Sequence, residues 1–182
     1  MIEAKNIILR NMRQDDLDTY MKVRGNYHDS GEFMPGRMET PVQLKKQFEE
    51  DGFWSENDGR LIILTKENKL IGDIGFFKSI PYVEGFELGY SIFPPEERGK
   101  GYMSEAAAVF SAYMFESKPI LRLQICTLKG NEPSAKVALN NGYVHEGTLK
   151  NATWLRGKTY DLEIFALYRE NCLSMKDTLA KL

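Results

Sequence analysis

The sequence has few of the residues from which metal sites and disulfide frameworks are built. It contains two cysteines, Cys126 and Cys172, and two histidines, His28 and His145. The cysteines lie far apart without a Cys-x-x-Cys spacing, so we expect reduced thiols in a cytoplasmic protein rather than a disulfide framework. Two histidines do not make a His-rich metal site, and we predict no bound metal.

Long apolar runs and a large charge of one sign are also missing. No apolar stretch approaches the roughly 18 residues that a membrane-spanning helix needs, and residues 1–10 have the pattern of neither a signal peptide nor a transit peptide. The formal net charge is −2, which gives no bulk attraction to nucleic acid and favours a cationic amine slightly over an anion as substrate. We therefore expect neither a nucleic-acid partner nor a membrane.

What is present fits one domain over residues 1–182. The chain has 42% hydrophobic and 27% charged residues, which is the balance of a globular protein with a sizeable core. Apolar periodicity predicts strands at 6–13, 60–66, 70–79, 86–93, 121–128, 143–149 and 159–168, with helices at about 16–24, 41–51, 104–117 and 131–141 and a weakly helical tail. A right-handed crossover would make strands 86–93 and 121–128 roughly parallel. The expected class is α+β.

The stretch 85–117 predicts a strand, a glycine-rich loop and a helix. Phe86, Leu88 and Tyr90 alternate with other residues at the period of a strand. Pro94-Pro95 ends this strand because proline cannot donate to a sheet ladder. The loop Arg98-Gly99-Lys100-Gly101 then leads into strong helix formers. Such a loop leaves several backbone N–H groups free at a helix N-terminus, where they bind phosphate or pyrophosphate.

Two common phosphate loops do not match this segment. A P-loop has four residues between its glycines and a Lys followed by Ser or Thr, whereas Gly99 and Gly101 are separated only by Lys100. A dinucleotide fingerprint requires a third glycine three residues after the second, and position 104 is Ser. From the loop alone, a plain strand–helix turn remains an open alternative.

The order of motifs around the loop resembles the GNAT superfamily of acyl-CoA-dependent N-acyltransferases. Within it, the chain is similar to the branch that acetylates ribosomal-protein N-termini, polyamines and small amines. One position departs from the family pattern, because Glu96 stands where the pyrophosphate signature has Gln or Arg. The resemblance covers nearly the whole chain and is carried by 87–90 (ELGY), 98–106 (RGKGYMSEA), 131–134 (NEPS), 141–143 (NGY), 146–147 (EG), Asp161 and 168–169 (YR).

The resemblance implies a mixed, splayed central sheet of about seven strands flanked by helices, the GNAT fold. It implies acetyl-CoA as the acyl donor, with the pantetheine arm held between the strand that ends at Pro94 and the strand at Leu121. Arg98 and Lys100 side chains would reach phosphates or else be solvated, and Asn131 would bond the cofactor arm or else simply begin a helix. The implied cofactor-binding residues are Ile92 and Phe93 for the arm, the amides of Arg98, Gly99, Lys100, Gly101, Tyr102 and Met103 for the pyrophosphate, and Asn131.

The implied reaction is direct attack of a neutral amine on an acyl thioester, without a covalent intermediate. It needs a base, a donor to the oxyanion and an acid for the thiolate. Glu87 is the leading base because it would face away from the core helix, although it would otherwise be a solvated strand residue. Ser134 resembles the serine that acts as general acid toward the thiolate in this branch. The alternative is that Ser134 is only a hydroxyl in the first turn of a helix. Tyr143 is a second candidate for the acid and ranks below Ser134. A backbone N–H in a bulge at 88–92 would bind the oxyanion.

The acceptor is expected to be a small amine or a protein N-terminus, and the protein a monomer or a homodimer. Cys126 is expected in the core rather than as a nucleophile. Two alternatives stay open, a non-catalytic acyl-CoA-binding or partner-binding domain of the same fold and a nucleotide-binding protein that uses the same loop. Expected pocket walls are residues 27–38, Phe53, Trp54, Tyr82 and Trp154, with Glu32, Glu39 and Glu84 attracting a cationic amine.

Overall fold

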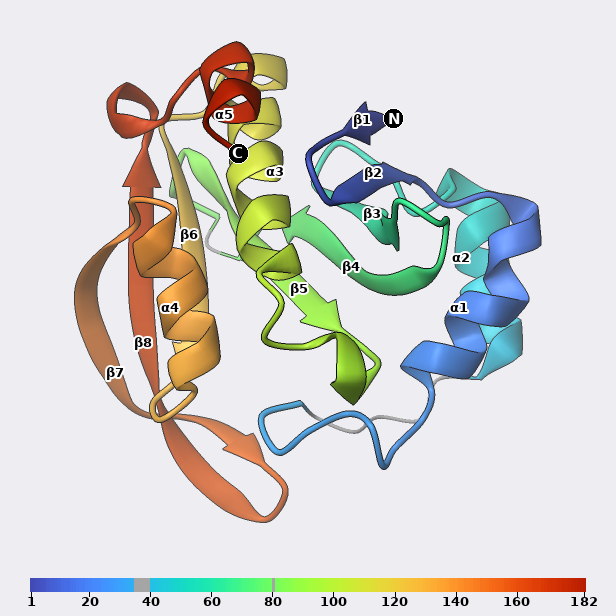
Figure 1. Ribbon diagram of the computed structural model, residues 1–182. Coiled ribbons are helices and arrows are strands. Elements are labelled where there is room, and N and C mark those ends of the chain that lie inside the picture. The colour runs from blue at the N-terminus through green and yellow to red at the C-terminus, as the bar shows by residue number, and fades with distance from the viewer. Residues whose placement is uncertain (35–39, 80) are drawn as a thin grey trace.

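The computed structural model describes residues 1–34, 40–79 and 81–182 and consists of a mixed open sheet with helices on both faces (Figure 1). The eight strands of the described sheet run in the order β1-β2-β3-β4-β5-β6-β8-β7. The strands are β1 (Ile2–Glu3), β2 (Ile7–Asn11), β3 (Asp58–Thr65), β4 (Leu70–Phe77), β5 (Gly85–Ile92), β6 (Arg122–Leu128), β7 (Val144–Leu155) and β8 (Lys158–Tyr168). The helices are α1 (Leu17–Arg24), α2 (Pro41–Asp51), α3 (Tyr102–Ser117), α4 (Glu132–Asn140) and α5 (Met175–Lys181).

These elements confirm the predicted α+β class and correct its details. The sequence predicts about seven strands, and the additional one is the two-residue strand β1, which pairs with β2. Strand β7 runs to Leu155 rather than to about residue 149, so Trp154 belongs to a strand and Arg156-Gly157 forms the turn to β8. No helix in the described ranges is long and apolar enough to cross a membrane.

The sheet separates in its middle, between β5 and β6. These strands are parallel, as predicted, and pair only at Gly85–Arg122, Phe86–Leu123 and Glu87–Gln124. Beyond this point β5 continues along β4 and β6 continues along β8, so the two strands diverge in Figure 1. The predicted splay is therefore present, and it begins at Glu87.

The two faces of the sheet have separate apolar cores. Helix α3 packs on one face, where Phe86 and Leu88 of β5 join its Phe110. On the opposite face, Tyr20 of α1 packs with Phe93 at the end of β5. Because successive side chains of a strand point to opposite faces, Glu87 lies on the α1 and α2 side, as the sequence predicts.

A buried carboxylate joins α3 to the N-terminal strands. Glu105 is only 6% exposed, and its oxygens accept hydrogen bonds from the backbone N–H and side-chain amide of Asn6, both at 2.7 Å, and from the N–H of Ile7 at 3.3 Å. These three donors lie at the start of β2, so one side chain fixes the start of α3 against the sheet. This contact holds the loop that precedes α3 in place.

Replacing Glu105 with alanine is expected to lower the free energy of unfolding by about 2 kcal/mol, because it leaves the buried N–H of Ile7 and the partly buried donors of Asn6 without this acceptor. Urea denaturation followed by circular dichroism measures this change. The matched control is Glu49→Ala, since Glu49 is exposed on α2. Equal unfolding midpoints for the two variants would contradict the assigned role of Glu105.

Candidate functional site

The glycine loop forms an open cradle at the N-terminus of α3. Gly99 and Gly101 have φ angles of 73° and 85°, in the left-handed region that favours glycine. A Cβ placed on either one meets no heavy atom within 4 Å, and no side chain caps the helix. The first N–H groups of a helix have no partner within it, and the helix dipole adds positive potential there. The cradle therefore fits a pyrophosphate.

The basic side chains of this loop are engaged elsewhere in the protein. The Lys100 ammonium donates to Glu97 at 2.7 Å, and Glu97 also accepts from Lys69 at 2.6 Å. The Arg98 guanidinium donates to the carbonyl of Ile92 at 2.9 Å, to the carbonyl of Phe93 at 2.6 Å and to the carbonyl of Asp29. In this structure the cradle is thus made by the backbone, whereas both cations bind protein oxygens.

Along the edge of β5 that faces the split, the backbone N–H and C=O groups point away from β4 and are not hydrogen-bonded to it. Phe93 donates its N–H to Ile71 of β4 at 2.9 Å, and the β4–β5 register is continuous. Alternate residues of a strand hydrogen-bond toward the same side, so Leu88, Tyr90 and Ile92 present their backbone groups to the split.

Two expectations about this strand need correction. The continuous register leaves no bulge at 88–92, so the backbone N–H groups there reach the split from a regular strand. Of the two residues predicted to pair with the pantetheine arm, Ile92 faces the split, although its carbonyl accepts from Arg98. Phe93 does not, because its N–H belongs to the β4 ladder and its ring is buried.

A pair of hydroxyl groups lies on the α3 and α4 side of the split. The Tyr90 hydroxyl is 3.0 Å from the Ser134 Oγ, and burial raises the pKa of Tyr90 to about 12. Asn131 caps α4 by accepting from the Ser134 N–H at 3.3 Å. Its oxygen therefore has the helix-capping role that the sequence left open as an alternative. Tyr90 was not predicted as a site residue, although its position three residues beyond Glu87 on the α3-facing side was a usable signal.

Tyr143 is close enough to Tyr90 for the two phenols to interact electrostatically, but its hydroxyl has a different hydrogen-bond partner. It is 2% exposed, its hydroxyl is 2.8 Å from the Ser111 Oγ in the middle of α3, and burial raises its pKa. Among the described contacts, the Tyr143 hydroxyl thus bonds to Ser111 and not to Ser134 or Glu87. The sequence pattern gives no indication of this burial, which comes from the packing of α3.

Glu87 lies on the other face, at the last paired position before the split. Its Oε2 accepts from the Gln124 amide at 3.0 Å, and the same amide nitrogen donates to the Ser79 Oγ at 3.0 Å. Gln124 is only 6% exposed, so the carboxylate is held by a buried partner. Burial, followed by the charge of Glu87, raises the pKa of Cys126 to about 12, which keeps that thiol protonated. Cys126 is only partly buried and belongs to neither apolar core, so the expectation of a core residue is wrong.

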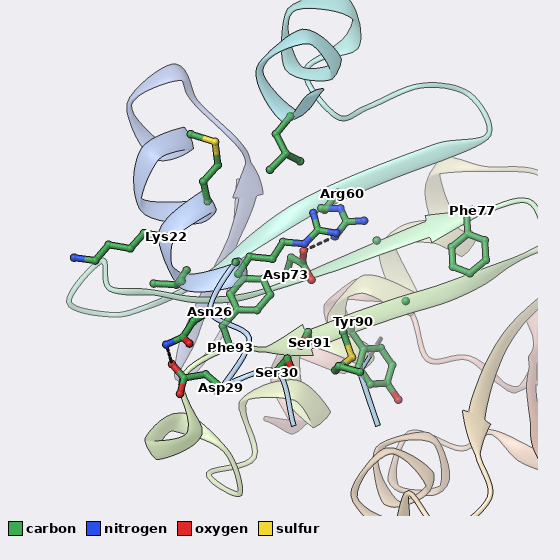
Figure 2. Close-up of a pocket in the computed structure, with 18 of the residues that line it drawn as sticks. Lys22, Asn26, Asp29, Ser30, Arg60, Asp73, Phe77, Tyr90, Ser91 and Phe93 are labelled. Carbon is green, nitrogen blue, oxygen red and sulfur yellow. Dashed lines mark hydrogen bonds and ion pairs between the residues drawn. The ribbon is translucent and has the colours of Figure 1, made fainter. Parts of the chain in front are cut away.

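A cavity of about 660 Å³ opens on this same face, between the end of α1, the loop after it and strands β3 to β5 (Figure 2). Gly75 and Gly89 are direct cross-strand partners and line its floor without side chains. Phe77, the cross-strand partner of Glu87, also lines the cavity. The geometry places Glu87 beside the cavity rather than within its wall.

A buried charge network forms another part of the cavity wall. The Arg60 guanidinium contacts the Asp73 carboxylate at 2.5 Å, and the Tyr20 hydroxyl donates to the same carboxylate oxygen at 2.6 Å. Asp73 is 3% and Tyr20 0% exposed, and burial raises the pKa of Tyr20. Opposite charges thus lie side by side in this wall, and the phenol stays protonated.

Most of the aromatic and acidic residues expected around the pocket lie elsewhere. Phe53 is buried against Tyr20, and Trp54 packs on Phe76 and Tyr113. Among the described residues, those that line the cavity do not include exposed Tyr82, Trp154, Glu32 or Glu84. Residues 35–38 and Glu39 lie outside the described part. The described residues also contain no group of three or more His, Cys, Asp or Glu side chains placed to hold a metal.

The chain matches the acetyltransferase (GNAT) domain over residues 6–144. It is 31% identical over 107 residues to the ribosomal-protein-serine acetyltransferase of Escherichia coli (strain K12), a match that spans 59% of each chain. It is 25% identical over 172 residues to the uncharacterized N-acetyltransferase YoaA of Bacillus subtilis (strain 168), covering 93% of this chain and 97% of that one.

A solved structure agrees in fold over nearly the whole chain. Spermidine N-acetyltransferase from Vibrio cholerae, in complex with CoA and spermine, superposes with a TM-score of 0.79 at 18% identity, covering 93% of this chain and 99% of that one. The chain therefore shares the fold of that enzyme, and the family match over residues 6–144 shows that it belongs to the GNAT acetyltransferase family.

Proposed function

We propose that this protein transfers an acetyl group from acetyl-CoA to the primary amine of a small molecule or a protein N-terminus. The observation that carries the proposal is the split after Glu87. The glycine cradle and the Tyr90–Ser134 pair lie on its α3 and α4 side, and a cavity of about 660 Å³ opens on the other face and reaches Tyr90. Donor and acceptor would approach from opposite faces and meet in the gap. The names of the relatives, which act on ribosomal protein and on spermidine, support amine acceptors of either kind.

The donor side is proposed to use mainly backbone groups. The amides of the cradle would hold the pyrophosphate, and the free edge of β5 would pair with the pantetheine arm as an added strand would. Because the Asn131 oxygen caps α4, its amide nitrogen is the group proposed to donate to the arm. The cradle residues in this proposal are Arg98, Gly99, Lys100, Gly101, Tyr102 and Met103.

The acid is proposed to be Ser134, supported by Tyr90. Acetyl-CoA supplies an activated thioester, so the protein needs to position an amine and move protons rather than form a covalent intermediate. The raised pKa of Tyr90 keeps its phenol protonated at neutral pH, so the hydroxyl pair has a proton to pass to a leaving thiolate. We do not extend this role to Tyr143, whose hydroxyl is buried against α3.

The base is proposed to be Glu87, acting directly or through a water molecule. Its carboxylate is fixed by Gln124 at the start of the split and on the face that carries the cavity. The free N–H groups of β5 at 88–92 are proposed to bind the oxyanion. Since Glu87 and Tyr90 lie on opposite faces of one strand, the two proton transfers would occur on opposite sides of the reacting carbonyl.

Binding and turnover test the function directly. At about 100 times its Kd, acetyl-CoA should stabilise the fold by about 2.7 kcal/mol in a thermal-shift assay, while ATP and NAD should not. Thiol release should then follow on adding spermidine or peptides that begin with Ser or Ala. Stabilisation by ATP or NAD alone would identify the nucleotide-binding alternative. Stabilisation by CoA without turnover of any amine would identify a non-catalytic CoA-binding domain.

The Glu87→Gln variant should lower kcat/KM by about 100-fold or more, which is the usual size of a general-base contribution. The loss should be largest at low pH, where more of the amine is protonated and a base matters most. A pH profile of thiol release measures it, with Glu84→Gln, an exposed neighbour before β5, as control. Identical profiles for wild type and Glu87→Gln would remove Glu87 from the mechanism.

The Ser134→Ala variant should lower kcat by about tenfold to 100-fold without weakening acetyl-CoA binding, because an acid acts on the leaving group rather than on the bound donor. The decrease in kcat should be smaller with an acetyl thioester whose thiol is more acidic, since that thiolate leaves without being protonated by an acid. Tyr143→Phe is the matched comparison and should reduce stability while kcat of the folded enzyme stays unchanged. A kcat loss in Tyr143→Phe but not in Ser134→Ala would reverse the assignment.

A further inference from the structure

The loop that follows α1 forms one wall of the cavity, and its residues 26–34 make few contacts with the rest of the described chain. We call residues 26–34 the acceptor loop, since Asn26, Asp29, Ser30 and Met34 line the cavity. None of its nine residues is buried. Within the described ranges, its backbone-to-backbone hydrogen bonds are local, from Asp29 to Asn26 and from Ser30 to Tyr27. Because the acceptor loop has no buried residues of its own, it needs contacts from other parts of the chain to hold a single conformation.

One such contact comes from the glycine loop. The Arg98 guanidinium donates to the carbonyl of Asp29 in the acceptor loop, and the same side chain donates to Ile92 at 2.9 Å and Phe93 at 2.6 Å at the end of β5. Arg98 therefore ties the acceptor loop to the end of the strand that borders the split. Its backbone belongs to the cradle, while its side chain belongs to the cavity wall.

The second contact comes from the tip of the β7–β8 hairpin, which Figure 1 shows extending toward the acceptor loop. Arg156 donates to the carbonyl of Met34 at 3.1 Å and to the Ser30 Oγ at 2.7 Å, and its guanidinium lies 4.9 Å from the centre of the Tyr27 ring. Its φ of 46° is unusual for a residue other than glycine. One side chain thus holds three residues spread along the loop.

In the described part of the chain, Arg98 and Arg156 make the only hydrogen bonds that tie the acceptor loop to distant elements. We propose that these two arginines are positioning residues for the acceptor: they hold the acceptor loop as a wall of the cavity, and Arg98 acts on the acceptor side rather than as a phosphate ligand. This rests on the proposed function. A guanidinium suits the task because its planar donors reach several oxygens in fixed directions, which an ammonium group does not do.

The first test needs no acceptor. In hydrogen–deuterium exchange, Arg98→Ala and Arg156→Ala should each speed exchange of residues 26–34 by at least about tenfold, because each removes one long-range tie. Exchange in α3 and β4 should not change. The control is Lys158→Ala, an exposed residue of the same hairpin. Unchanged exchange in residues 26–34 of both arginine variants would overturn the proposal.

The second test separates positioning from phosphate binding. With spermidine or a peptide that begins with Ser, whichever the wild type acetylates, both variants should raise the acceptor KM by about tenfold while kcat and the Kd of CoA stay within about twofold. Arg98→Lys and Arg156→Lys should restore little of the wild-type acceptor KM, because they keep the charge and lose the planar donors.

If Arg98→Ala raises the Kd of CoA tenfold and leaves the acceptor KM unchanged, Arg98 is a phosphate ligand and the proposal is wrong. If the wild type binds no CoA, the proposed function fails, and the exchange test still decides whether the arginines hold the loop.

Discussion

The pairing of β5 with β6 stops after Glu87 and Gln124, and the arrangement of the site depends on that stop. Each strand keeps its other neighbour, so β5 follows β4 to Ile92 and β6 follows β8 to Leu128. The facing edges beyond the stop are left with backbone donors and acceptors that need partners. A chain-like ligand with amide groups can satisfy them, which is why a split sheet suits a pantetheine arm.

The alternation of side chains along β5 places the proposed base and the tyrosine that supports the proposed acid on opposite faces of the sheet. Side chains one or three positions apart on a strand point to opposite faces, so Glu87 and Tyr90 cannot bond to each other. Each has its own partner on its own side, Gln124 for the carboxylate and Ser134 for the phenol. The proposed base and the hydroxyl pair of the proposed acid therefore lie a few residues apart on one strand but on opposite sides of the gap, where the amine and the thioester would meet.

Local patterns predicted much of this arrangement, and long-range neighbours account for the rest. Alternation along β5 correctly placed Phe86 and Leu88 toward α3 and Glu87 away from it, because that rule involves only the strand itself. The glycine cradle was equally visible as a sequence motif. The burial of Tyr143 against Ser111 was not, since the two residues are 32 positions apart and meet only through packing. Nor could the sequence show that the Arg98 guanidinium binds the carbonyl of Asp29, because these two residues lie 69 positions apart and meet only in the folded chain.

The division of Arg98 between backbone and side chain links the two halves of the site. Its amide is at the edge of the cradle, and its guanidinium contacts the end of β5 and the acceptor loop. A group bound in the cradle would therefore contact the backbone of a residue whose guanidinium lies in the cavity wall. If binding at either site shifted Arg98, the resulting coupling would be reciprocal. A single arginine thus gives this fold a short physical path between its two proposed binding sites.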